Sequence, residues 1–365
     1  YPNGHVRIYE NIADSWVQVG LDIDGDNLDE WSGRSVSLSS DGSTVGIGGQ
    51  YSYKNRVYKN IGNNWTRVGD EIPERSGSSG ATSLSSDGSI FVIADDNGNG
   101  GGGNGKVSIY ENKTGNWAQI GSSIFRGNSN ENLLGHSIHL SANGSILAIG
   151  IPYTTNNTGG LVKVYELISN NWVQIGGNIK DGNAPNEFGM GLSLSQDGSI
   201  LAIGSPSESQ NNVYGGSVRI YQNINNAYVQ VGNIINGDST MSNIGYSIDL
   251  SSDGSTLAIG SRANGVRVYS IDSKAPTISG PGGETSIEEN STVVHTFSAD
   301  ETVTWSLSGG VDKDLFTIDS ITGQLSFISA PNYEIPTDSD SNNIYQVVVK
   351  ATDSARNIST QELTI

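Results

Sequence analysis

Short runs of alternating apolar and polar residues recur along most of the chain. One phrase occurs five times, at 35–48, 81–94, 136–150, 191–204 and 246–260, and each copy holds two apolar runs joined by Asp-Gly or Asn-Gly. These dipeptides predict tight β-hairpins, because both central residues of such turns need a positive φ. A serine that follows a leucine marks each copy and recurs every 46 to 56 residues, which predicts a repeated β-unit. The marker residues are Ser39, Ser85, Ser141, Ser195 and Ser251.

Two further strand-like phrases alternate with the hairpins. A Val-x-x-Tyr phrase lies at 5–11, 56–60, 106–112, 161–167, 217–223 and 265–271. A phrase with Trp or Tyr follows the first five of these, at 15–20, 64–69, 116–121, 171–176 and 227–232. Four antiparallel strands in about 50 residues are typical of a propeller blade. The sequence therefore predicts an all-β chain that begins with a β-propeller of about five four-stranded repeats, or with part of one that has six or seven.

A β-solenoid is the main structural alternative, but its repeats are usually shorter and lack paired Asp-Gly hairpins. In the propeller, the leucines before the marker serines are expected in the core: Leu38, Leu84, Leu140, Leu194 and Leu250. The recurring aromatic residues are expected to pack between blades rather than to stack on sugars, because their phase is regular: Trp16, Trp65, Trp117, Trp172 and Tyr228.

The segments 188–189, 201–206 and 216–221 resemble the FG-GAP repeats of integrin-type propellers, and Gly150, Ile151 and Pro152 form a second such site. The chain looks most like the degenerate version found in secreted surface proteins of Bacteroidetes-type bacteria. This resemblance covers residues 1 to about 273 and implies a secreted, extracellular protein at the cell surface. Blades of this family often bind calcium between their first two strands. Here that loop is Ser-Ser-Asp-Gly-Ser, whose single carboxylate is too few for an ion that takes six to eight oxygens.

The repeat stops after Tyr269, and Pro276 ends a short polar linker. We therefore expect a propeller over 1–273 and a second domain over 274–365. The second domain resembles a cadherin-like, Ig-like β-sandwich through the segments 287–290, 297–300, 316–319, 322–325, 332–334 and 347–353.

The cadherin-like resemblance implies a candidate Ca²⁺ site at each end of the sandwich. Glu289, Asn332 and Glu334 would lie at the far end, and Asp300, Asp353 and Asp272 at the end that faces the propeller. Oxygen ligands from separate strands suit Ca²⁺, the only cofactor expected. The sequence departs from the family pattern, since Asp300 is followed by Glu301 and Thr302 in place of the usual Asp-x-Asp. The alternative is a set of surface carboxylates left from a degenerate motif.

The composition limits the function further. A net charge of −19 argues against nucleic acid and against an anionic membrane surface as partners. The chain has no cysteine and no apolar stretch of 18 residues, so disulfides and membrane insertion are not expected. Because Tyr1 opens the chain without a Met or a signal peptide, we expect a processed or partial product of a longer precursor.

Three motifs look chemical but predict no enzyme. The G-x-x-x-x-G-K run at 100–106 is followed by Val107 and a strand rather than by Ser or Thr and a helix. The acidic run at 22–30 has its glycine at the wrong position for an EF-hand. His136 and His139 are three residues apart in a strand and so face opposite ways. Two carboxylates for glycoside hydrolysis could come from any two loops, and no pair stands out.

Three Asp-Ser/Thr-small-or-apolar triplets resemble the O-glycan acceptors of Bacteroidetes-type bacteria. They place candidate glycosylation sites at Ser239, Ser320 and Ser354.

These observations predict a non-enzymatic, extracellular structural or adhesive protein that binds itself, a cell-surface partner or glycans. A surface fibre could form head to tail by strand addition, because one of the strands 5–11 and 265–271 is surplus and 362–365 leaves an edge open. Within one molecule, the strand 15–20 is expected to pair with 266–270 and close the propeller. The alternative function is that of a carbohydrate-binding module in a larger secreted protein.

Overall fold

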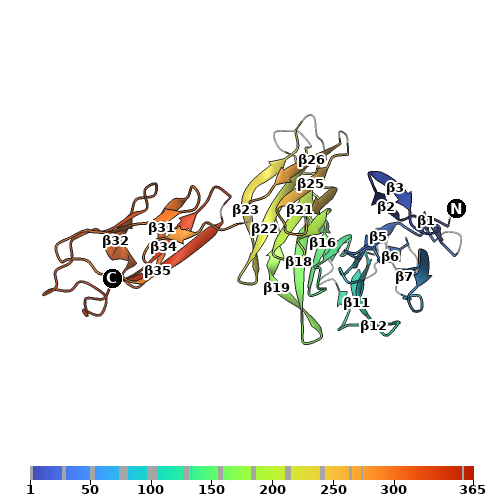
Figure 1. The fold of residues 1–365 in the computed structure, drawn as a ribbon, viewed down its shortest axis with the longest axis horizontal. Coiled ribbons are helices and arrows are strands. Elements are labelled where there is room, and N and C mark those ends of the chain that lie inside the picture. The colour runs from blue at the N-terminus through green and yellow to red at the C-terminus, as the bar shows by residue number, and fades with distance from the viewer. Residues whose placement is uncertain are drawn as a thin grey trace. The chain divides into compact units, whose positions relative to one another are not determined.

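The computed structural model describes residues 3–26, 30–49, 54–73, 81–96, 105–125, 131–132, 134–154, 159–181, 186–209, 215–238, 243–262, 265–272, 274–355 and 357–365. The described residues form an all-β protein with one 3-10 turn, η1 (Lys313–Leu315). None of their helices is long and apolar enough to cross a bilayer. The chain divides into two compact units, drawn in Figure 1. Unit 1 comprises 1–230 and 234–271, and unit 2 comprises 231–233 and 272–365.

In unit 1, each hairpin phrase begins an antiparallel sheet whose strands follow chain order. Sheet 1 contains β5 (Ser35–Leu38), β6 (Thr44–Gly48), β7 (Arg56–Ile61) and β8 (Asn64–Arg67). Sheet 2 contains β9 (Thr82–Leu84), β10 (Ile90–Asp95), β11 (Lys106–Lys113) and β12 (Asn116–Gln119), with β13 (Ile124–Phe125) added to β11. Sheet 3 contains β15 (Ser137–Leu140), β16 (Ile146–Ile151), β18 (Leu161–Ile168) and β19 (Asn171–Ile179).

Sheet 4 contains β20 (Leu192–Leu194), β21 (Ile200–Ser205), β22 (Ser217–Ile224) and β23 (Ala227–Asn236). Sheet 5 has three strands, β24 (Ser247–Leu250), β25 (Thr256–Gly260) and β26 (Val266–Ser270). The remaining strands form three pairs: β1 (His5–Val6) with β4 (Ile23–Asp24), β2 (Tyr9–Ile12) with β3 (Ser15–Gln18), and β14 (Glu131–Asn132) with β17 (Tyr153–Thr154).

The hairpin phrase recurs because its polar residues hold the turn. In sheet 1, Ser39 Oγ donates to Asp41 Oδ1 at 2.7 Å, and the Ser43 backbone N–H donates to the same oxygen at 2.9 Å. Ser39 Oγ also accepts from the backbone N–H of Thr44 at 2.9 Å. Gly42 supplies the positive φ of +69°. Asp87, Asn143, Asp197 and Asp253 accept the same two bonds in the other sheets.

Acid should weaken these hairpins only at low pH. Bonds from the Ser39 hydroxyl and the Ser43 N–H lower the pKa of Asp41 to about 2, and Ser251 and Ser255 do the same for Asp253. Because the folded-state pKa lies below the ordinary value near 3.8, the stabilisation is complete above about pH 4 and is lost as the pH falls toward 2.

The variant with both Asp41→Asn and Asp253→Asn should therefore lose less thermal stability between pH 4 and pH 2 than the parent does. Asn143 shows that an amide can make the same turn bonds. Melting temperatures recorded from pH 2 to 7 test this. Parallel curves for the two proteins would show that these carboxylates do not govern the acid response.

Successive sheets are joined by hydrogen bonds at repeated positions. In the turns, the backbone N–H of Ser40 donates to Ser86 O at 2.9 Å, and each later turn continues the series as far as Ser252. In the first strands, the Leu84 N–H donates to Ser37 Oγ at 2.9 Å, and Leu140 and Leu250 donate to the equivalent serines. We call these two series the inter-sheet ladder. It includes one histidine, because burial lowers the pKa of His139 and leaves Nδ1 free to accept from the Leu194 N–H.

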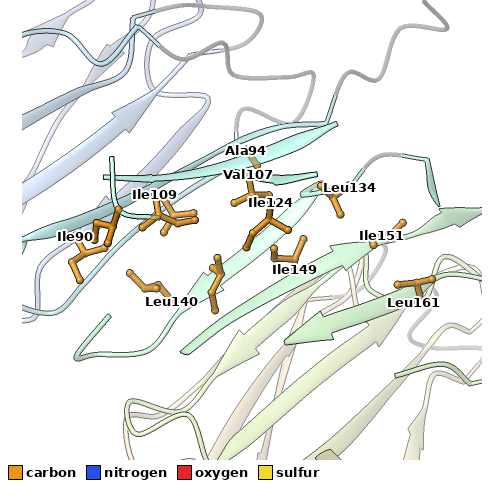
Figure 2. Packing of buried hydrophobic residues seen from close by; sticks show 13 residues of the cluster. Ile90, Ala94, Val107, Ile109, Ile124, Leu134, Leu140, Ile149, Ile151 and Leu161 are labelled. Carbon is orange, nitrogen blue, oxygen red and sulfur yellow. The ribbon is translucent and has the colours of Figure 1, made fainter. Parts of the chain in front are cut away.

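The core of unit 1 lies between successive sheets. Figure 2 shows one cluster, in which Ile149 and Ile151 of β16 pack with Val107 and Ile109 of β11. Both faces of the second strands are covered, so β16 and β21 are buried at every position. Trp65 and Trp117 cross between repeats, since their Nε1 atoms donate to Val19 O at 2.8 Å and Val68 O at 2.9 Å. This confirms the predicted inter-repeat packing for these two aromatics.

The first copies of two repeated residues were predicted wrongly: Leu38 was expected in the core, and Trp16 was expected to pack between blades. Leu38 is 48% exposed and Trp16 is 70% exposed, whereas the later leucines are buried. In the described part of the chain no earlier repeat sheet covers them. The expected closure is also wrong: β3 pairs with β2, and β26 pairs with β25. The tight hairpin occupies only one edge of β3, and none of the described strands pairs with its other edge.

Unit 2 has two main sheets around one core. Its strands are β27 (Ile278–Ser279), β28 (Gly283–Glu284), β29 (Val293–Thr296), β30 (Ser298–Ala299), β31 (Thr304–Gly309), β32 (Phe316–Ile318), β33 (Gln324–Phe327), β34 (Gln346–Thr352) and β35 (Ile358–Thr364). One sheet has the order β28-β35-β34-β31, the other β29-β33-β32, and β27 pairs with β30. Trp305 and Val349 from the first sheet meet Phe316 and Leu325 from the second.

The last strand of unit 2 does not leave the predicted open edge. β35 pairs with β34 on one side and, in parallel, with β28 on the other. This pairing was not predicted, because β28 is only two residues long and too short to be recognised as a strand in the sequence.

Candidate functional site

Three carboxylates converge in unit 2. Asp272 precedes β27, Glu301 follows β30, and Asp353 follows β34. One oxygen of each lies within 4.8 Å of the others. Asp353 is buried, whereas the other two are exposed. We call these residues the acidic cluster. Carboxylates brought together from separate strands are the ligands that Ca²⁺ prefers in proteins.

Asn357 completes the surroundings of the cluster. Its side-chain Nδ2 donates to Asp353 Oδ2 at 2.8 Å and to the backbone oxygen of Asp272 at 3.0 Å, and its backbone N–H donates to Asp353 Oδ1 at 2.8 Å. The residue is only 1% exposed, and its Oδ1 has no hydrogen-bond partner among the described residues. A buried amide oxygen without a partner costs about 1–3 kcal/mol. Rotation of the amide by half a turn would point this oxygen toward the carboxylates.

The electrostatics of the cluster favour a cation. Desolvation and then the nearby charges of Asp272 and Asp353 raise the pKa of Glu301. Like charges held this close destabilise each other, and a cation between them removes the repulsion.

Asp300 lies outside the cluster although the cadherin-like pattern includes it. Its Oδ2 accepts from Lys274 Nζ at 2.8 Å, and its Oδ1 accepts from the Thr277 backbone N–H at 2.6 Å. The bond from Lys274 and that from Thr277 lower the pKa of Asp300 to about 2. Glu301, which sequence reasoning treated only as a departure from the pattern, occupies the expected position. The sequence could have indicated this, since Glu301 directly follows Asp300 and also carries a carboxylate.

The predicted ligands at the far end are held by the main chain. Glu289 Oε2 accepts from the Tyr333 N–H at 3.3 Å, and Asn332 Oδ1 accepts from the Glu334 N–H at 2.9 Å. Among the described His, Cys, Asp and Glu side chains, the acidic cluster is the one group in which three ligand atoms converge. Of the candidate glycosylation sites, Ser320 and Ser354 are exposed, and Ser239 lies outside the described residues.

The remaining motifs contribute to ion pairs and strands. In the acidic run at 22–30, Asp22 accepts two bonds from Arg7, and Glu30 pairs with the buried Arg56; residues 27–29 lie outside the description. Lys106 opens β11, and most of the glycine-rich run before it lies outside the described ranges. His136 Nδ1 lies 3.3 Å from Asp96 Oδ2.

No protein-family model and no curated protein matches the chain. Among solved structures it is similar to a putative 6-phosphogluconolactonase from Bacteroides uniformis, with 12% identity and a TM-score of 0.48 over 99% of this chain and 92% of that one. A periplasmic gluconolactonase from Pseudomonas aeruginosa has 13% identity and a TM-score of 0.47 over 98% and 92%. A putative TolB from Agrobacterium tumefaciens has 14% identity and a TM-score of 0.42 over 74% and 84%. These neighbours are β-propeller-like.

The neighbours correct one expectation. The sequence predicted that the protein is not an enzyme, and this is wrong as an inference from the fold, because two of the similar structures carry the names of lactonases. A fold of this kind is shared with enzymes. At 12% and 13% identity the likeness concerns the fold alone and transfers no activity to this chain.

Proposed function

We propose that the protein is an extracellular structural or adhesive module of the kind found in secreted surface proteins of Bacteroidetes-type bacteria. It combines a propeller of about five repeats with a cadherin-like β-sandwich that binds Ca²⁺. The main support for this proposal is the acidic cluster of Asp272, Glu301 and Asp353, which lies beside the unpartnered Oδ1 of the buried Asn357. Three carboxylates, one amide oxygen and water supply the six to eight oxygens that Ca²⁺ takes.

The composition supports the extracellular role. The net charge of −19 keeps a protein soluble, and the absence of cysteine leaves metal ions and core packing as the means of stabilisation. We also propose that the protein associates with itself by strand addition, with β26 as the strand that accepts the added one. Val266 and Val268 are two-thirds exposed on this strand, and among the described strands only β25 pairs with it. An exposed apolar edge of this kind accepts a further strand.

Calcium should raise the melting temperature of unit 2 in the full chain. A ligand that binds only the folded state stabilises it by about 2.7 kcal/mol at 100 times its dissociation constant. Glu301→Gln should weaken Ca²⁺ binding at least tenfold, because it removes one of the three charges. Calorimetric titration with Ca²⁺ and melts in chelator or in millimolar Ca²⁺ measure both effects.

Two matched variants separate this site from general acidity. Asp314→Asn removes a carboxylate that is fully exposed and outside the cluster, and Asp300→Asn removes the one paired with Lys274. Both should bind Ca²⁺ as the parent does. Equal binding by the parent and Glu301→Gln, or identical melts with and without Ca²⁺, would overturn the calcium proposal.

A further inference from the structure

Three successive repeats of unit 1 bring hydroxyls together on one carboxylate. Tyr153 lies on β17, which follows β16 in the chain and pairs with β14, and its hydroxyl donates to Glu187 Oε1 at 2.5 Å. Ser207 Oγ, just after β21 of sheet 4, donates to Glu187 Oε2 at 2.7 Å. The Tyr246 hydroxyl, at the start of sheet 5, donates to the same oxygen at 3.5 Å. Glu187 itself lies just before sheet 4, so the group joins residues up to 93 positions apart.

A pocket opens beside this group. Its volume is about 500 Å³, and it is lined by Tyr246, Ser247, Gly260, Ser261 and Arg262. Pockets of about 300–1,000 Å³ are typical of small-molecule sites. The pocket shares Tyr246 with the hydroxyl group around Glu187, and the positive charge of Arg262 acts on the same tyrosine. The pocket wall therefore offers an aromatic ring and a guanidinium, and the Tyr246 hydroxyl links it to the Glu187 carboxylate.

Glu187 holds this position at a conformational cost. Its φ is +57°, a left-handed conformation in which Gly and Asn are common and Glu is not. The turn itself imposes the conformation, since Trp31 and Asn243 have φ of +50° and +55° at the same place in other repeats. Asn243 is the residue that this turn accommodates best. The turn therefore fixes the backbone at Glu187, and the place of its carboxylate follows from the turn.

We propose that Tyr246, Glu187 and Arg262 form a binding site for a neutral saccharide. A sugar ring presents an apolar C–H face and a rim of hydroxyls. The partly exposed ring of Tyr246 would stack on the apolar C–H face. The Glu187 carboxylate would accept hydrogen bonds from the sugar hydroxyls, and the Arg262 guanidinium would donate to them. Burial and the Glu187 charge raise the pKa of Tyr153 and of Tyr246, so both hydroxyls stay protonated donors. This site is independent of the acidic cluster in unit 2.

Binding is tested on the full chain with glucose, galactose, mannose and N-acetylglucosamine, by calorimetry and saturation-transfer NMR. The buffer contains chelator, so that any sugar binding that is measured does not depend on Ca²⁺ in unit 2. At least one sugar should bind saturably in the millimolar range. Tyr246→Ala should weaken this binding about tenfold through loss of the ring contact, and Glu187→Gln should weaken it by a similar factor.

Tyr9→Ala is the matched control, because Tyr9 is 46% exposed and Tyr246 is 41% exposed in the same unit. It should bind as the parent does. All variants are first shown to melt as a single folded species, so that lost binding is not lost folding. The proposal is overturned if none of the four sugars binds saturably, or if Tyr246→Ala binds them as well as Tyr9→Ala does.

Discussion

Arg219→Ala is expected to lower the free energy of unfolding of unit 1 by about 3–5 kcal/mol, the range found when one partner of a buried ion pair is removed. Arg219 on β22 is only 3% exposed. Its two terminal nitrogens donate to both oxygens of Glu208 at 2.7 and 2.8 Å, and Asp181 lies 3.6 Å away. Without the guanidinium, two buried carboxylates would face each other. Urea or thermal unfolding followed by circular dichroism measures the loss.

The repeats supply matched controls for this prediction. Arg7 occupies the same place in the Val-x-x-Tyr phrase and pairs with Asp22, but this pair is exposed, so Arg7→Ala should change stability little. Arg219→Lys should fall between parent and Arg219→Ala, because the charge remains and the two-pronged geometry is lost. Lys163 already occupies this position in sheet 3. If Arg7→Ala and Arg219→Ala lower the free energy of unfolding equally, burial of the ion pair does not explain the effect of Arg219→Ala.

Gly46→Ala is expected to destabilise unit 1 by about 1–3 kcal/mol, a typical cost of overpacking. A Cβ on Gly46 of β6 would lie 2.4 Å from the ring of Phe91 on β10, which is fully buried. The equivalent residues of sheets 3 and 4 are Ala148 and Leu201, which belong to one core cluster. The large Phe91 therefore requires the small Gly46 in the preceding sheet.

A double variant tests this pairing. Phe91→Leu alone should also be destabilising, because it leaves a cavity. Combining it with Gly46→Ala recreates the Ala and Leu pair of sheets 3 and 4. The free energy of unfolding lost in the double variant should be smaller than the sum of the two single losses by about 0.5–3 kcal/mol. Strict additivity in equilibrium unfolding would show that the two positions do not compensate.

The repeated residues were predictable wherever a local motif decides the structure. Asp-Gly, or Asn-Gly in sheet 3, predicted the first hairpin of each sheet because the turn needs only its own residues, and in sheet 1 Ser39 and Asp41 close it. The inter-repeat contact of Trp65 followed from its regular phase. Leu38 was predicted wrongly because the residues around it match those around Leu84. The two leucines differ only in that a repeat sheet precedes Leu84 and none precedes Leu38 among the described residues.

The candidate site was only partly predictable. Asp272 and Asp353 came from the family pattern, but the choice between Asp300 and Glu301 depends on which one Lys274 reaches. Asn357 was missed, because nothing in the sequence marks an amide whose oxygen is left without a partner on folding. The group around Glu187 was also missed, since its members are scattered over three repeats and belong to no motif.

The inter-sheet ladder makes the repeats exchangeable parts. Each middle sheet donates to and accepts from both of its neighbours at equivalent positions, so a gene duplication that inserts a copy of sheet 3 beside sheet 4 would meet ready-made junctions on both sides. Sheets 1 and 2 are the exception, since Gly46 and Phe91 fit each other and would have to be inherited together. A lineage could therefore lengthen or shorten this protein at its middle sheets by recombination while its first two stay adjacent.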